Sequence, residues 1–220
     1  VDYLSVLAED PARAVALADE TTARSVPAQR IARDATPLPH SLAVYAQFSL
    51  YPLVAFAVVA ISALMTALGR RAVRSRLAAA PVSGGSRGLG LLGACLVIGV
   101  VGWLWIFGLG IAVFGAGSVT ASAPLLGVVG AALGAYALVA VAVGFLIGQI
   151  GLGRSAANAV ANIGGMALSF IAGAWIPSGW LPDAVVAVSR FTPGYWAVRA
   201  ISGAHTAASM SADTIGPLLA

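Results

Sequence analysis

The most constraining feature of this sequence is a run of arginines between two long stretches that carry no charge. Residues 70–87 (RRAVRSRLAAAPVSGGSR) contain five arginines, whereas residues 35–69 and 88–153 contain no Asp, Glu, Lys or Arg. A bilayer hydrocarbon core of about 30 Å is crossed by about 20 apolar residues in helical form. The first charge-free stretch can therefore hold one membrane span, and the second can hold two.

Composition and charge support a protein with several membrane spans. Hydrophobic residues make up 60% of the sequence and charged residues 9%, a balance that excludes an ordinary soluble domain. The net charge of +4 arises mainly from the arginine-rich stretch, so it does not indicate nucleic-acid binding. Basic loops next to membrane spans lie on the cytoplasmic side. We therefore predict a cytoplasmic loop at residues 69–88.

The apolar stretches predict an all-α membrane bundle. Four spans are expected within a transmembrane domain at residues 41–176, and Pro52 is expected to kink the first of them. Four glycines in the third span have the small-xxx-small spacing that lets helices approach closely. The expected spans cover residues 41–68, 89–110, 125–150 and 156–176.

The two ends of the chain are predicted to lie outside the cytoplasm. Residues 1–40 carry ten charges, and we interpret them as the end of an external domain. Translocation of so many charges needs a preceding span or signal, so we expect this sequence to be a fragment of a longer chain. The alternative is that residues 1–40 form a short domain that is translocated alone. Prolines divide residues 177–220 into short pieces, which predicts re-entrant or interfacial helices leading to a missing last span.

The fourth expected span carries a stripe of polar and small residues. Its members recur every three or four positions, as residues on one face of a helix do. Two asparagines in an apolar helix cost free energy unless they are paired or hydrated. The stripe either packs against a neighbouring helix or lines a translocation path, and both alternatives stay open. The residues concerned are Asn158, Asn162 and Ser169, with Ser155, Gly165 and Gly173 beside them.

Several kinds of chemistry have no support in the sequence. A phosphate-binding loop of the Walker type needs a lysine, and the chain has none. His40 and His205 stand alone in the sequence, so they do not indicate a metal site. No set of catalytic residues can be assembled, which predicts that the chain is not an enzyme. A secondary transporter would place ionisable residues inside its spans, and the four expected spans contain none.

The order of these segments resembles the membrane subunits of ABC-2 type exporters. The resemblance covers residues 41–203 and rests on the basic loop RSRLAAAPVSGGSR, on NAVANIGG in the fourth span, and on IPSGWLP followed by FTPGYW. It implies a six-span permease, of which four spans are present here, in a bacterial inner membrane. The expected function is export of a hydrophobic or amphipathic substrate such as a drug, lipid or lipid-linked molecule. A membrane scaffold, or a secondary transporter, is the alternative.

The resemblance also implies particular partners. A separate ABC subunit would bind ATP and Mg²⁺, so this chain would hold no cofactor of its own, and a second permease copy or homologue would complete a dimer. The basic loop would dock on the ATPase through Arg74, Arg76 and Arg87, because guanidinium groups pair with carboxylates at two points. Alternatively, the arginines only set the topology.

The local sequence predicts the shape of this loop. The helix of the first span is expected to continue through Arg74 and to stop before Pro81. Ser83 is expected to cap the next helix. The Gly84–Gly85 pair is expected to form a tight reversal into the second span.

Overall fold

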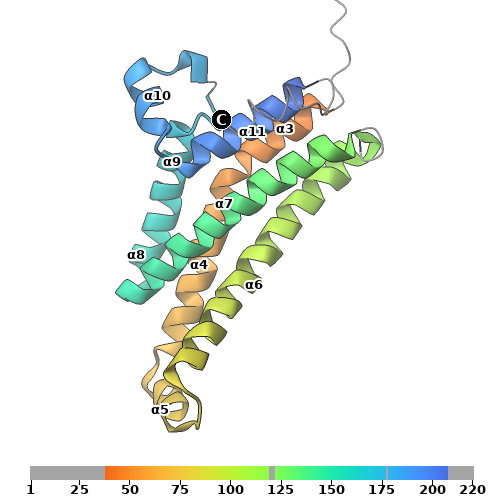
Figure 1. Cartoon of the computed structure of the whole chain (residues 1–220). Helices are drawn as coiled ribbons and strands as arrows, with labels where there is room; N and C mark the ends of the chain where they lie inside the picture. The colour runs from red at the N-terminus through yellow and green to blue at the C-terminus, as the bar shows by residue number, and fades with distance from the viewer. Residues whose placement is uncertain (1–37, 119–121, 177, 208–220) are drawn as a thin grey trace, which may run out of the picture. The chain divides into compact units, whose positions relative to one another are not determined.

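The computed structural model describes residues 38–118, 122–176 and 178–207, which all belong to one compact unit, Ala35–Ala220. Most of the predicted external segment therefore lies outside the described residues, as does the end of the chain. The regular structure within the described ranges is helical, and Figure 1 shows its arrangement. The helices are α3 (His40–Phe48), α4 (Leu50–Leu68), α5 (Arg71–Ala79), α6 (Gly84–Gly110), α7 (Ala123–Ile150), α8 (Arg154–Ala159), α9 (Gly165–Ile171), α10 (Asp183–Ser189) and α11 (Pro193–Thr206).

Three helical segments in the described part of the chain are long and apolar enough to cross a membrane. They are His40–Leu68, which comprises α3 and α4, Gly84–Gly115, which is α6 with a π-helical turn at its end, and Ala123–Ile150, which is α7. Their lengths are 29, 32 and 28 residues. These segments confirm the prediction of an all-α membrane bundle and coincide with the first three expected spans.

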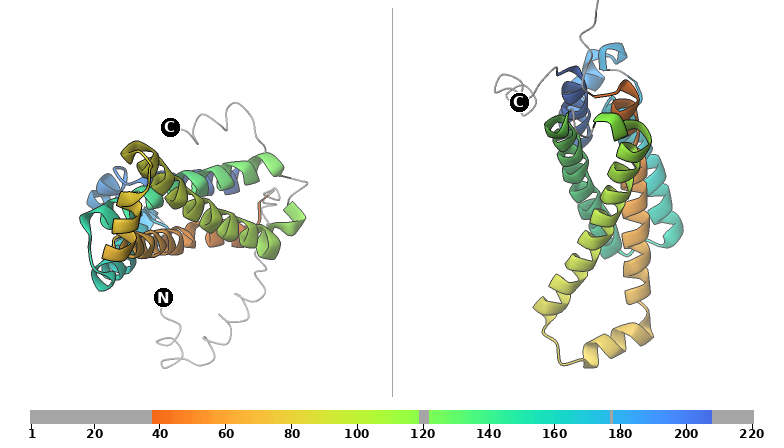
Figure 2. Two further views of the ribbon diagram at one scale, coloured as in Figure 1. Left: turned by 90° about the horizontal axis from the view of Figure 1, so that it is seen from below. Right: turned by 90° about the vertical axis from the view of Figure 1, so that its right-hand side faces the viewer.

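Helix α4 lies at the centre of the bundle. It packs most extensively against α7 and also contacts α6, α8 and α9, as Figures 1 and 2 show from three directions. The side chains that α4 buries, among them Leu53, Val58 and Ile61, recur every three to five residues, as expected of one face of a helix. Opposite them, α7 buries Leu133 and Ala140 among others. The α4–α7 pair therefore forms the core of the described unit.

The glycines of α7 confirm the predicted close approach of helices. A Cβ atom added to Gly144 would lie 3.1 Å from the Cα atom of Val58 in α4, and one added to Gly148 would lie 2.5 Å from Met65. On the α6 side of α7, a Cβ atom at Gly130 would lie 2.8 Å from the ring of Phe107. These positions admit no side chain unless the neighbouring helix moves or repacks.

Helix α6 buries small residues and exposes large ones. Its buried residues are Cys95, Gly99, Gly102 and Gly110, whereas Trp105 keeps 72% of its surface exposed. Two hydrogen bonds attach α6 to the rest of the bundle. The indole Nε1 of Trp103 donates to the carbonyl oxygen of Gly130 at 2.9 Å, and the hydroxyl of Tyr45 donates to the carbonyl oxygen of Ile106 at 3.0 Å.

The first span bends where Pro52 predicts a kink. Proline lacks the N–H group that would bond to the carbonyl of residue i−4, and its ring collides with that carbonyl, which here belongs to Phe48. Helix α3 ends at Phe48 and α4 begins at Leu50. The hydroxyl of Ser49 between them donates to the carbonyl oxygen of Tyr45 at 2.7 Å. The bend allows α3 to leave the line of α4 (Figure 1).

The fourth expected span is helical but differs from the prediction. It runs from Arg154 to Ile171 as α8, a π-helical turn (Val160–Gly164) and α9, and it packs along α4. It ends before residue 176 because the chain turns at Gly173, whose φ of 79° lies in the region that favours glycine. It is not among the three segments that are long and apolar enough to span a membrane.

The chain after the fourth expected span, where short re-entrant or interfacial helices are predicted, forms the helices α10 and α11. Pro193 stands at the first position of α11, and the hydroxyl of Thr192 accepts a hydrogen bond from the N–H of Tyr195 at 3.4 Å, as in a capped helix start. Helix α11 packs against both α7 and α3 and buries Ala197 and Ile201. It is therefore part of the bundle, with one buried face.

Candidate functional site

The basic loop folds as a helical hairpin at one end of the bundle, and we call residues 69–88 the basic hairpin (Figure 1). The expectation that the first helix continues through Arg74 is wrong. Helix α4 ends at Leu68, Arg70 is extended (φ −61°, ψ 136°), and α5 is a separate helix. Helix α5 stops before Pro81, as predicted, because the residue before a proline is forced out of the helical region and Ala80 is extended (φ −70°, ψ 141°).

The start of α6 confirms one expectation for this loop and corrects another. The hydroxyl of Ser83 accepts a hydrogen bond from the N–H of Ser86 at 3.2 Å, so Ser83 caps the helix as predicted. The Gly84–Gly85 pair does not form the reversal. Both glycines lie in the first turn of α6, and neither has a positive φ. The reversal is made by Ala80, Pro81 and Val82 instead.

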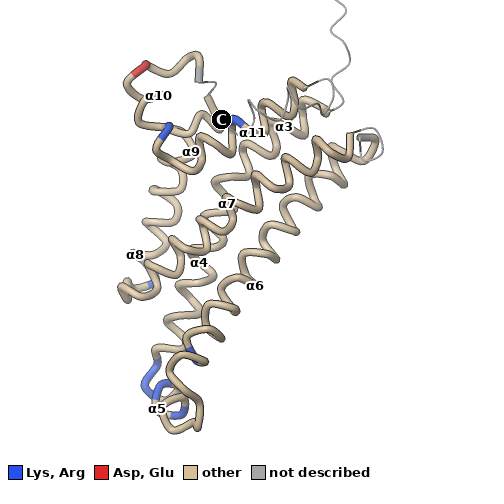
Figure 3. The backbone as a smooth tube through the Cα atoms, in the orientation of Figure 1, with Lys and Arg blue, Asp and Glu red and all other residues tan. Residues whose placement is uncertain are grey.

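Four of the five arginines of the basic hairpin are exposed to solvent, and Arg87 is half-buried. Figure 3 shows basic residues gathered around α5. Arg74 and Arg76 are exposed, and the described residues offer them no carboxylate, because Asp183 in α10 is the only acidic residue in the described ranges. Arg87 is different: its guanidinium donates to the carbonyl oxygen of Val82 at 3.3 Å. Arg87 therefore braces the hairpin, while Arg74 and Arg76 are free for a partner.

The polar stripe of the fourth segment divides into two parts in the structure. Asn158 and Asn162 are exposed, whereas Ser169 is fully buried, with no hydrogen-bond partner for its hydroxyl among the described residues. The predicted spacing assumed an α-helix throughout. The π-helical turn Val160–Gly164 lies inside the stripe and changes which positions share a face.

Asn162 connects the fourth segment to the first span. Its Oδ1 atom accepts a hydrogen bond from the hydroxyl of Tyr51 in α4 at 2.8 Å, and its Nδ2 atom donates to the carbonyl oxygen of Asn158 at 2.9 Å. One amide thus serves both as a link between helices and as support for its own helix.

A small pocket lies between α4 and the start of α8. Its volume is about 180 Å³, and it is lined by Val59, Ser62, Ala63, Arg154, Ala157 and Asn158. The buried hydroxyl of Ser62 has no hydrogen-bond partner among the described residues. The pocket brings Asn158 together with Arg154, the first residue of α8.

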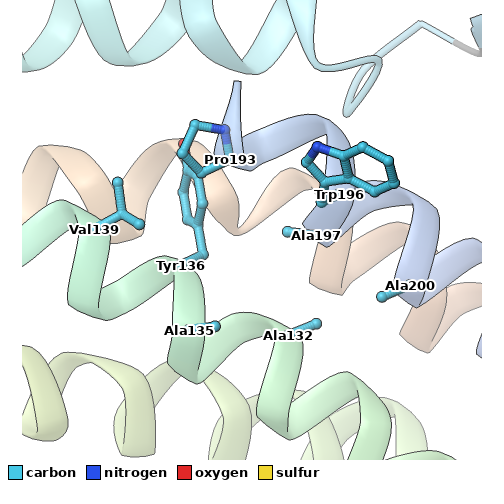
Figure 4. Close-up of a pocket in the computed structure, with 8 residues that line it drawn as sticks. All are labelled: Ala132, Ala135, Tyr136, Val139, Pro193, Trp196, Ala197 and Ala200. Carbon is cyan, nitrogen blue, oxygen red and sulfur yellow. The ribbon is translucent and has the colours of Figure 1, made fainter. Parts of the chain in front are cut away.

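A larger groove lies between α7 and α11, and Figure 4 shows the side chains that line it. Its volume is about 360 Å³. Apart from the hydroxyl of Tyr136 and the indole of Trp196, the lining side chains are aliphatic. The residues are Ala132, Ala135, Tyr136, Val139, Pro193, Trp196, Ala197 and Ala200. Such a surface suits an apolar molecule or an acyl chain.

Comparison with known families agrees with this architecture. The model of a family described as ABC-2 family transporter protein matches residues 6–218. The chain belongs to the ABC-2 family of transporter proteins. No curated protein and no solved structure matches it.

Membership of the ABC-2 family gives the bundle its general role. The chain is a membrane permease subunit of an ABC transporter, and the family implies an ABC ATP-binding partner. The three long apolar segments agree with this membrane role. The resemblance drawn from the basic loop and the IPSGWLP and FTPGYW motifs is therefore confirmed.

The structure of this ABC-2 protein also shows a pair of residues that sequence reasoning missed. His40 in α3 and His205 in α11 are far apart in the sequence, yet their ring centroids lie 5.4 Å apart. Within the described ranges, no group of three or more His, Cys, Asp or Glu residues could hold a metal ion. The only signal in the sequence was that these are its two histidines, and no spacing rule connects them.

Proposed function

We propose that this chain exports a hydrophobic or amphipathic substrate across the plasma membrane of a bacterium, driven by ATP that a separate subunit hydrolyses. The observation that carries the proposal is the basic hairpin. It presents an arginine-rich helix, α5, whose main contact with the bundle is with α4.

The exposed arginines support docking on an ATP-binding subunit. Helix α5 buries none of its residues, so it contributes little to the packing of the bundle. Arg74 and Arg76 lack acidic partners in the described part of the chain, and their planar guanidinium groups suit two-point pairing with carboxylates. The hairpin would bind an acidic surface of the partner and transmit its movements into α4 and α6. ATP and Mg²⁺ would bind to that partner.

The nature of the substrate is supported by the groove between α7 and α11. Its aliphatic and aromatic lining can solvate an acyl chain or a polycyclic drug, but it offers almost no groups to replace the water around an ion. We therefore favour a drug, a lipid or a lipid-linked molecule. Asn158 and Asn162 do not line this groove; on the fourth segment they would offer polar groups along a separate part of the path.

The outer face of α6 supports an assembly of two permeases in a bilayer. Val97, Val101, Leu104 and Trp105 are exposed, and an apolar surface of this kind is covered by lipid or by another membrane protein. A second permease copy or homologue would cover part of it.

The experiment that tests the proposal neutralises two arginines of α5. Arg74→Gln and Arg76→Gln are introduced together, which leaves Arg70, Arg71 and Arg87 to maintain the topology. The matched control is Arg190→Gln with Arg199→Gln, which removes two charges from α10–α11. The measurements are co-purification of the ATP-binding subunit, its ATPase activity, and efflux of a fluorescent hydrophobic dye from cells.

We expect the hairpin variant to insert normally but to lose most of the co-purified ATPase and of the efflux, while the control keeps both. Retention of partner and efflux by the hairpin variant would show that the arginines act only as topological signals. If the parent neither co-purifies with an ATPase nor transports, the scaffold alternative gains support.

A further inference from the structure

We infer that His40 and His205 bind a divalent transition metal ion, with Zn²⁺ as the best fit, and that the ion joins α3 to α11. These helices lie at the end of the bundle away from the basic hairpin (Figure 1). The inference is independent of the proposed transport function.

The spacing of the two rings fits a shared ion. Imidazole nitrogens bind Zn²⁺ at about 2.0–2.1 Å in tetrahedral geometry, which places the centroids of two rings on one ion about 5 Å apart. The observed centroid distance is 5.4 Å, with an angle of 49° between the ring planes. This separation allows one nitrogen of each ring to reach a shared ion when the two side chains adopt suitable rotamers.

His205 is held with a free nitrogen available for a metal. Its Nδ1 atom lies 3.0 Å from the carbonyl oxygen of Leu38. Because a carbonyl oxygen can only accept, Nδ1 carries the proton and donates, which leaves the lone pair of the neutral ring on Nε2. A hydrogen bond from the second ring nitrogen to a carbonyl is the usual support of a metal-binding histidine.

The pair lies in a pocket of about 410 Å³ whose lining is mostly apolar, with Phe48, Trp175 and Val198 among its residues. Besides the histidines, its polar side chains are those of Gln47, Ser202 and Thr206. Among the described residues, no lysine or arginine lines this pocket, so no side-chain cation of that part of the chain competes with the ion. Water and a hydroxyl group can fill the remaining coordination positions. Imidazole with oxygen ligands suits Zn²⁺, Ni²⁺ or Cu²⁺ rather than Ca²⁺ or Mg²⁺.

The site would have a mechanical effect because its ligands come from two helices. The Nε2 atom of Gln47 in α3 already donates to the hydroxyl of Ser202 in α11 at 2.9 Å. A metal ion bound by His40 and His205 would add a second link between α3 and α11, nearer the start of α3. It would thereby connect the beginning of the first span to the last described helix.

The chain offers a clean assay, because it contains only two histidines and one cysteine, which is buried in α6. The full chain is purified without a polyhistidine tag and titrated with ZnCl₂ by calorimetry. We expect one ion per chain. His40→Gln and His205→Gln should each weaken binding by about tenfold or more, since losing a ligand costs at least as much as losing its outer support. The matched control Ser41→Ala, at an exposed residue of α3 outside the pocket, should bind Zn²⁺ as the parent does.

A second measurement separates metal binding from packing. His40 is exposed, so His40→Gln should leave the melting temperature without metal unchanged. Zn²⁺ should raise the melting temperature of the parent, because a ligand of the native state stabilises it, and should not raise that of His40→Gln. Electron paramagnetic resonance with Cu²⁺ should show two coupled imidazole nitrogens in the parent and one in this variant. Absence of saturable Zn²⁺ binding in the parent, or equal binding by His40→Gln, would overturn the inference.

Discussion

Substitution of Gly144 by alanine tests whether a close contact with the backbone of α4 holds α4 against α7. The added Cβ atom would lie 3.1 Å from the Cα atom of Val58 and 3.2 Å from the carbonyl oxygen of Ala57. Both are backbone atoms, which cannot rotate away as a side chain can. The two helices must therefore separate by a few tenths of an ångström. Overpacking of this kind costs about 1–3 kcal/mol.

Gly127→Ala provides the control on the same helix. A Cβ atom at Gly127 meets nothing within 4 Å. Gly127→Ala therefore gains the same helix propensity, up to about 1 kcal/mol in favour of alanine, without a contact to α4. The difference between the two variants isolates the contact. At about 2–4 °C per kcal/mol for a chain of this size, Gly144→Ala should melt about 2–12 °C below Gly127→Ala.

Cys95 supplies the assay for this comparison. It is the only cysteine in the sequence and it is fully buried in α6. A maleimide dye that fluoresces when it reacts with a thiol will therefore report the temperature at which α6 leaves the bundle. If Gly144→Ala melts at the same temperature as Gly127→Ala or above it, the α4–α7 contact does not depend on the missing side chain, and the packing argument fails.

Two further predictions concern the polar face and the orientation of the chain. Asn162→Leu removes the acceptor of the Tyr51 hydroxyl. It should lower the free energy of unfolding by about 0.6–1 kcal/mol, the usual value of a hydrogen bond in a membrane. A loss of efflux at an unchanged melting temperature would instead identify a translocation path. In a Cys95→Ala background, a cysteine at Ser25 should react with an impermeant maleimide in intact cells and one at Ser83 should not, and the reverse pattern would disprove the topology.

The long spans could be predicted from the sequence because hydropathy over a window depends on composition alone. The bend before Pro52 and the cap at Ser83 were predictable for a similar reason: each follows from the local chemistry of one residue. The spacing of glycines in α7 likewise marks a close helix contact, although it cannot say which helix lies opposite.

The features that sequence reasoning missed depend on contacts between distant segments or on small changes of helix geometry. A π-helical turn has no sequence signature here, so the register of Asn162 relative to Ser169 could not be derived. The break at Arg70 and the helical conformation of Gly84 follow from the way the hairpin closes. The approach of His40 to His205 requires α11 to pack on α3, which no periodicity in either helix indicates.

The arrangement of α6, with glycines inward and large apolar side chains outward, has a thermodynamic consequence in a bilayer. Lipid tails are as apolar as the side chains they replace, so the association of α6 with its neighbours rests on dispersion and on hydrogen bonds such as that of Trp103 rather than on release of water. Burial of apolar surface from water gives unfolding a large heat-capacity change, which curves the temperature dependence of the free energy of unfolding and weakens stability on cooling. The packing of α6 against the bundle therefore lacks this curvature and does not weaken on cooling.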